Sequence, residues 1–160
     1  MKTVRVLLAL TFVFTLLGIF TSSANAVGCR GQQCEGLNPQ TMGCGTDAVR
    51  AGNVKYLSDG GTNLSYVETR KSSACDAKWA RTTNVSGGSR YAAATLRYGC
   101  SNYCYTKDVR SPDVIANGLP VYTPMHGLAA TPTRSCGAVR TTGPIPVPIS
   151  LNDSWCTGSN

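Results

Sequence analysis

The chain has 160 residues, with 15 basic and 8 acidic side chains, a formal net charge of +7, eight cysteines and one histidine. The basic residues are scattered singly, which argues against a nucleic-acid-binding patch. One histidine and the absence of any Cys-x2-Cys pair argue against a metal centre, and no Gly-rich phosphate loop suggests a nucleotide cofactor. We therefore expect no metal, no cofactor and no nucleic-acid partner.

The N-terminus has the three parts of a secretory signal peptide. Lys2 and Arg5 form a basic start, an apolar run extends over residues 6–20, and Ala24-Asn25-Ala26 is a small-x-small cleavage site. Cleavage after Ala26 leaves residues 27–160 as one domain, with 13 basic and 8 acidic residues and a net charge of +5. No later run is long and apolar enough to span a bilayer. We expect a secreted monomer without stable membrane insertion.

All eight cysteines follow the signal peptide, and an even number in an exported protein predicts four disulfides. The spacing leaves their pairing open. They are Cys29, Cys34, Cys44, Cys75, Cys100, Cys104, Cys136 and Cys156.

Short alternating segments separated by turn residues predict an all-β fold, a small disulfide-bonded barrel or sandwich. Residues 29–50 are rich in glycine and cysteine and predict an irregular, stapled N-terminal segment. The expected strands, in chain order, are 54–57, 64–70, 79–85, 91–98, 121–122 and 138–142.

Two segments carry more detailed predictions. Residues 83–91 read as a hairpin around Gly87-Gly88, since glycine supplies the positive φ of such turns. Residues 143–149 alternate prolines with Ile145, Val147 and Ile149. In an extended chain the missing donors would lie on one edge, which would end a sheet; a polyproline II ligand is the other interpretation.

Few side chains suggest catalysis. A Ser-His-Asp site would need His126, but no GxSxG elbow is present. Asp47 and Glu68 are the one carboxylate pair that we consider for a small hydrolase, because glycoside hydrolysis needs two carboxylates at a defined separation.

The segment 67–81, VETRKSSACDAKWAR, places charged and aromatic groups on alternating positions. If its two halves pair as strands, Glu68 faces Arg81, or Arg70 stacks on Trp79. Such pairs stabilise a sheet. The same Arg70, Trp79 and Arg81, if exposed, would form a binding face for a carbohydrate or an anionic group.

The order of several motifs resembles one family of proteins. These motifs are Cys29-x4-Cys34-x4-Pro39-x4-Cys44-x2-Asp47-Ala48, Val67-Glu-x-Arg70-x4-Cys75-x3-Trp79-Ala-Arg81, Tyr122-Thr-Pro-Met125, Arg134-x-Cys136 and Cys156-Thr157. Together they resemble the YjfA-like secreted bacterial proteins, domain of unknown function 2690. The resemblance implies a bacterial, exported, disulfide-bonded domain and implies no activity. Members usually read Leu-Arg-Tyr-Ser where this chain has Thr69-Arg70-Lys71-Ser72, and Cys100 and Cys104 fall in an insertion.

Three functions are consistent with these observations. The first is a non-enzymatic binding module at the cell surface or in the medium, with a cell-wall polymer, a glycan or a secreted protein as its partner. The second is a small secreted hydrolase that uses Asp47 and Glu68. The third is an inhibitor of an extracellular enzyme that presents the Cys100–Cys104 loop.

Overall fold

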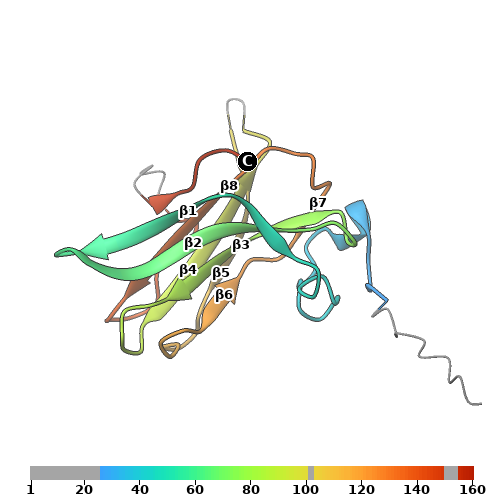
Figure 1. Ribbon diagram of the computed structural model, residues 1–160. Helices are drawn as coiled ribbons and strands as arrows, with labels where there is room; N and C mark the ends of the chain where they lie inside the picture. The colour runs from blue at the N-terminus through green and yellow to red at the C-terminus, as the bar shows by residue number, and fades with distance from the viewer. Residues whose placement is uncertain (1–25, 101–102, 150–154) are drawn as a thin grey trace, which may run out of the picture.

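A computed structural model describes residues 26–100, 103–149 and 155–160 and shows two antiparallel sheets (Figure 1). The predicted signal peptide, apart from Ala26, lies outside these residues. The first sheet has the order β1-β2-β3-β6, with β7 also paired to β3, and the second has the order β5-β4-β8. The strands are β1 (Val49–Asp59), β2 (Thr62–Ser72), β3 (Ala77–Asn84), β4 (Tyr91–Tyr98), β5 (Tyr105–Arg110), β6 (Pro120–Tyr122), β7 (His126–Gly127) and β8 (Thr133–Arg140). The all-β prediction is confirmed, and neither sheet closes into a barrel.

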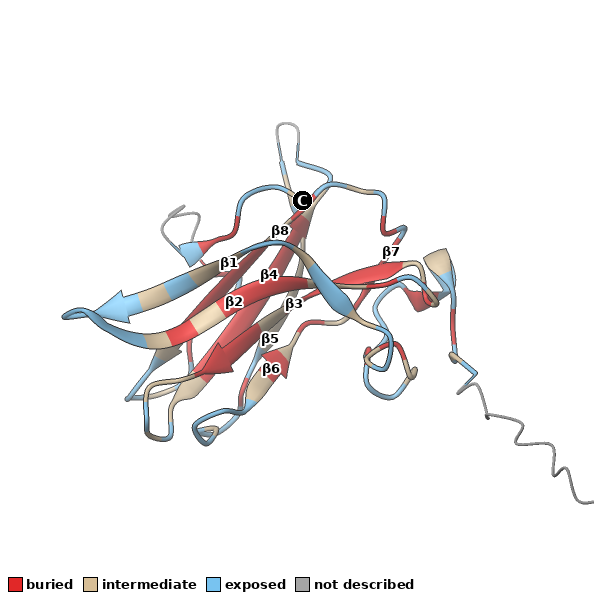
Figure 2. Ribbon diagram, in the orientation of Figure 1, coloured by how far each residue is buried: buried red, intermediate tan, exposed pale blue. Residues whose placement is uncertain are grey.

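The two sheets pack face to face through β2 and β3 on one side and β4 and β8 on the other. Figure 2 shows β4 and β8 buried over most of their length, whereas β1 is largely exposed. Thr69 Oγ1 and Ser135 Oγ form a hydrogen bond of 2.7 Å across the interface. A Cβ on Gly137 would lie 2.4 Å from Thr82 Oγ1 and 2.7 Å from Val67 Cβ, so glycine permits the close approach of the sheets at this point.

A second core lies on the outer face of β3. The lead-in segment, residues 26–48, contains the short 3-10 helix η1 (Gly31–Cys34) and lies near β7 (Figure 1). Trp79 and Met125 are buried there against four cysteines. The expected irregular, stapled segment is therefore present, and it covers one end of the first sheet.

The described residues contain four disulfides, as the even cysteine count predicts. Two of them staple the lead-in segment, one closes a short loop after β4, and one ties the C-terminal residues to β8. The pairs are Cys29–Cys34, Cys44–Cys75, Cys100–Cys104 and Cys136–Cys156.

The predicted hairpin over residues 83–91 is wrong. β3 pairs with β2, β6 and β7, whereas β4 pairs with β5 and β8, so residues 85–90 cross from one sheet to the other. The Asn84 side chain donates to the carbonyls of Gly88 and Ile115, which fixes this crossing without a two-strand ladder. The turn residues predict that the chain changes direction here. The hydrogen bonds of the Asn84 side chain hold it as a crossing between the sheets rather than as a hairpin.

The proline-rich segment keeps its predicted alternation but forms no strand. Ile145 and Ile149 are buried against the second sheet, and the prolines between them are exposed. Ile149 N donates to Thr95 Oγ1, a side chain rather than a ladder carbonyl. The expected sheet edge is therefore wrong, and hydrophobic burial explains the pattern.

Residues 155–160 run beside β8 and reach the first sheet. Thr133 and Asn160 exchange two backbone hydrogen bonds of 2.8 and 2.9 Å. The buried Lys78 donates from Nζ to the carbonyls of Thr131 and Asn160, each at 3.1 Å. Burial, with repulsion from Lys71, lowers the pKa of Lys78. No helix among the described residues is long and apolar enough to cross a membrane.

Candidate functional site

The outer face of the first sheet holds Glu68, Arg70 and Arg81 of the segment 67–81. Val67 and Thr69 point toward the second sheet, so strand alternation turns Glu68 and Arg70 outward. In the ladder Glu68 lies opposite Arg81, and Arg70 lies opposite Trp79. The predicted pairing of Glu68 with Arg81 is confirmed. Arg70 does lie across from Trp79, and the stacking of the two side chains stays a prediction.

Glu68 is the buried centre of two ion pairs. Its Oε1 accepts from Arg81 Nε at 2.7 Å, and its Oε2 accepts from Arg50 Nε at 2.9 Å. The Glu68 side chain is 0% exposed, whereas those of Arg81 and Arg50 are 27% and 56% exposed. Each guanidinium has five N–H donors and Glu68 has two oxygens, so the ion pairs occupy only part of the arginine donors.

Trp79 and Arg70 hold the lead-in segment rather than form part of the exposed face. Trp79 is 1% exposed and packs in the second core, so its ring is covered. Arg70 Nη2 donates to the carbonyl of Ala48. Of the three predicted binding residues, Arg81 is the one that lies beside the exposed arginine Arg50. A binding role for Arg70, Trp79 and Arg81 stays a prediction.

Positive charge is concentrated on this face. Burial lowers the pKa of Arg70, and repulsion from Arg81 and Arg50 lowers it further, against the attraction of Glu68. For Arg50, the hydrogen bond from its guanidinium to Glu68 raises the pKa. Three arginines therefore lie close enough to repel one another around one carboxylate, which pairs with two of them, and an added anion would lower this repulsion.

Tyrosines flank the arginines. Tyr56 is 54% exposed and lies opposite Tyr66, with ring centroids 5.8 Å apart. Tyr122 lies opposite Arg81 on β6 and is half-buried. We call this set, which consists of Arg50, Tyr56, Tyr66, Arg81 and Tyr122, the arginine–tyrosine face.

Side chains of β1 on both sides of a bulge point to this face. Between Ala51 and Lys55 the strand contains a bulge, opposite Thr69 and Val67. The bulge adds an even number of residues, so Arg50 and Tyr56 point the same way on either side of it.

Asp47 and Glu68, the predicted hydrolase pair, both accept hydrogen bonds from the protein itself. Asp47 accepts from Ser72 Oγ and, at 2.9 Å, from Ala74 N. Burial alone would raise the pKa of Asp47, but the hydrogen bonds from Ser72 and Ala74 outweigh it and lower this pKa. A general acid needs a raised pKa, so the arrangement of Asp47 suits an anchor for the lead-in segment.

A second polar cluster, around Glu35, was not predicted from the sequence. Glu35 Oε2 contacts His126 Nδ1 and Gly127 N, both at 2.9 Å, and Oε1 contacts Lys107 Nζ at 2.7 Å. The rings of His126 and Tyr98 stack with centroids 3.9 Å apart. Nε2 of His126 is buried, so this histidine is held in place rather than presented to a substrate. Sequence spacing gives no signal for the cluster, because 91 positions separate Glu35 from His126.

The short loop after β4 is closed by the Cys100–Cys104 disulfide, and Tyr103 beside it is 88% exposed. Residues 101–102 lie outside the described residues. The inhibitor interpretation of this loop stays a prediction.

Comparison with protein families gives a match. The family described as "Protein of unknown function (DUF2690)" matches residues 32–131, which include the whole arginine–tyrosine face. Neither the curated proteins nor the solved structures contain a match.

Proposed function

The chain belongs to the DUF2690 family, whose function is unknown, and we propose that it is an exported, non-enzymatic module that binds acidic glycans of the cell surface. The observation that carries this proposal is the pair Arg50 and Arg81, which the buried Glu68 fixes on an exposed face. A fixed arginine loses less conformational freedom on binding than a mobile one.

The chemistry of the arginine–tyrosine face fits an acidic sugar polymer. A guanidinium binds a carboxylate or a phosphate through two parallel N–H donors. The exposed ring of Tyr56 offers an apolar surface on which the face of a sugar ring can pack, and its hydroxyl group offers a donor. Charge and ring surface lie side by side on β1 and β2.

The proposed location rests on the cysteines and on the leader. Disulfides persist in oxidising environments, and four of them fit an extracellular protein. Residues 1–26 have the pattern of a signal peptide.

Binding to purified cell-wall material and to soluble acidic polysaccharides, measured by co-sedimentation and calorimetry, tests the proposal. The binding variant is Arg50→Gln with Tyr56→Ala, which leaves Arg81 paired with Glu68. The matched control is Arg110→Gln with Tyr105→Ala, because both residues are exposed on β5 in the other sheet.

We expect wild-type protein and control to bind, more weakly at high salt, and the binding variant to lose most of its affinity. Equal losses in both variants would indicate a response to net charge alone. Absence of wild-type binding to every acidic glycan would contradict the proposal outright.

A further inference from the structure

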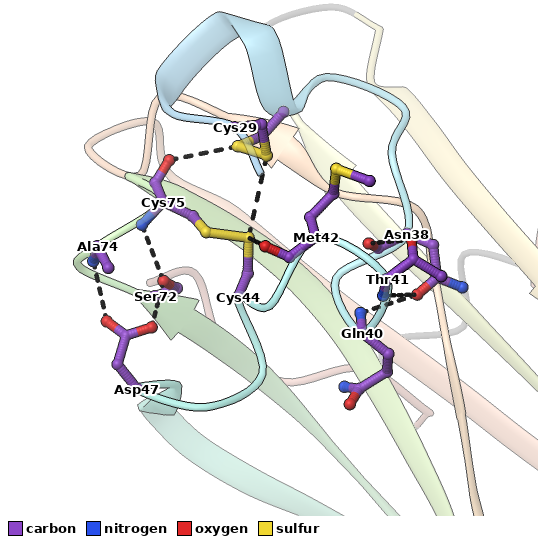
Figure 3. Close-up of a disulfide and its surroundings, with 11 residues drawn as sticks. Cys29, Asn38, Gln40, Thr41, Met42, Cys44, Asp47, Ser72, Ala74 and Cys75 are labelled. Atoms are coloured by element: carbon purple, nitrogen blue, oxygen red, sulfur yellow. Dashed lines mark hydrogen bonds between the residues drawn. A yellow bond between two sulfur atoms is a disulfide. The ribbon is translucent and has the colours of Figure 1, made fainter. Parts of the chain in front are cut away.

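The sulfur atoms of Cys29, Cys34, Cys44 and Cys75 form one buried group, which we call the cysteine quartet. Figure 3 shows three of them, Cys29, Cys44 and Cys75, close together. All four lie within 4.8 Å of one another, although they are paired as two disulfides. Between the disulfides, Cys29 Sγ and Cys44 Sγ are 3.9 Å apart.

The separation between Cys29 Sγ and Cys44 Sγ is close to that in a tetrahedral metal site. A Zn–S bond of about 2.3 Å gives sulfur–sulfur edges of about 3.8 Å. The gap between Cys29 and Cys44 already has that length, and every other pair lies within 4.8 Å. The two bonded pairs must lengthen when the disulfides open. We propose that the cysteine quartet, once reduced, is a tetrathiolate binding site for Zn²⁺.

Contacts other than disulfides hold the quartet together. Gly31 N donates to Cys75 O at 2.7 Å, and Gly28 N donates to Met42 O at 2.9 Å. The carboxylate of Asp47 binds both Ser72 and Ala74, which ties the chain after Cys44 to the turn before Cys75 (Figure 3). None of these hydrogen bonds uses a cysteine sulfur, so they favour the same arrangement of the two segments after reduction.

The surroundings suit a closed structural metal site. Cys34, Cys44 and Cys75 are 0% exposed and Cys29 is 6% exposed, and Trp79 and Met125 pack against them. Soft thiolates select zinc over hard cations such as Ca²⁺ and Mg²⁺. The spacing Cys29-x4-Cys34 also falls within the range of zinc ligand pairs. The spacing of cysteines along the chain argued against a metal site, because it cannot show that the fold brings Cys44 and Cys75 close to Cys29 and Cys34.

The chemistry balances as an exchange between two states of one site. Two dithiol molecules reduce the two disulfides to four thiols and become two disulfides themselves. Zn²⁺ then binds four thiolates, and four protons are released. Reaction with two molecules of a small disulfide reverses the process: it forms both protein disulfides, yields four small thiolates and releases Zn²⁺.

Cobalt titration of the reduced protein tests the site. The oxidised protein is reduced with an excess of a phosphine under anaerobic conditions and titrated with Co²⁺. We expect one Co²⁺ per chain, with the intense visible bands and thiolate charge-transfer bands of a tetrahedral tetrathiolate. Zn²⁺ should bleach these bands, and the oxidised protein should show none.

Three double variants make the assignment specific. Cys29→Ser with Cys34→Ser, and separately Cys44→Ser with Cys75→Ser, should lose the tetrathiolate spectrum. Cys136→Ser with Cys156→Ser, which removes the other described buried disulfide, should keep it.

The outcome is decisive even when reduction unfolds the chain, because metal binding to the quartet then restores the circular dichroism of the folded protein. Absence of stoichiometric Co²⁺ binding by the reduced wild-type protein would overturn the proposal. So would an unchanged spectrum in either quartet variant.

Discussion

Replacement of Glu68 by glutamine gives the sharpest test of the ion-pair centre. Glutamine keeps the shape of the side chain, but its amide NH₂ group faces one of the two guanidiniums that Glu68 now binds. The bond to Arg81, which is 27% exposed, contributes about 1.5–3 kcal/mol as a hydrogen bond between charged groups. The pair with Arg50, which is 56% exposed, contributes about 0.2–1 kcal/mol.

We therefore expect Glu68→Gln to lower the free energy of unfolding by about 2–4 kcal/mol, which corresponds to a fall in Tm of roughly 10 °C for a domain of this size. Urea unfolding of the oxidised protein measures the free energy of unfolding, and thermal unfolding measures the Tm. A double-mutant cycle should give a larger coupling free energy for Glu68 with Arg81 than for Glu68 with Arg50. An unchanged Tm, or the reverse order of couplings, would refute the reasoning.

Three further predictions concern other parts of the fold. Gly137→Ala should destabilise the protein by about 1–3 kcal/mol in urea unfolding, because the added Cβ meets Thr82 and Val67; a neutral effect would show that the sheets can separate there. Removal of the Cys44–Cys75 disulfide, which spans 31 residues, should cost about 3.7 kcal/mol by loop entropy, against about 1.9 kcal/mol for Cys100–Cys104, which spans 4. Comparable losses on unfolding would contradict the entropic account. For Glu35, burial alone would raise the pKa, but Lys107, Gly127 and His126 outweigh it and lower it from 4.5. Glu35→Gln should therefore be less stable than wild type above pH 4.5, by less than about 1 kcal/mol for this partly exposed group, and the difference should vanish as the pH falls through the lowered pKa. A difference that persists in acid would point to packing instead.

The sequence was sufficient to predict the pairing of β2 with β3 in the first sheet. Alternation in residues 64–70 and 79–85, with a short turn between them, predicts Glu68 opposite Arg81, and the ladder confirms it and places Arg70 opposite Trp79. Such predictions succeed because the period of a strand is fixed and the connection is short.

The sequence could not predict which distant segment covers a given face of a sheet. Trp79 is buried because the lead-in segment folds over it, and that segment has no periodicity that could reveal its position. β5 (Tyr105–Arg110) was missed because its half-buried residues give no apolar run. The cluster around Glu35 joins four elements far apart in the chain, so nothing local indicates it.

The bulge in β1 affects how readily copies of this protein can pair through their edge strands. β1 lies at the end of its sheet, and an uninterrupted outer strand would offer a template for stacking molecules into fibrils. The irregularity between Ala51 and Lys55 breaks that template, since a second chain cannot keep its register past the extra residues. The bulge thereby disfavours amyloid-like pairing of copies of this protein along the β1 edge.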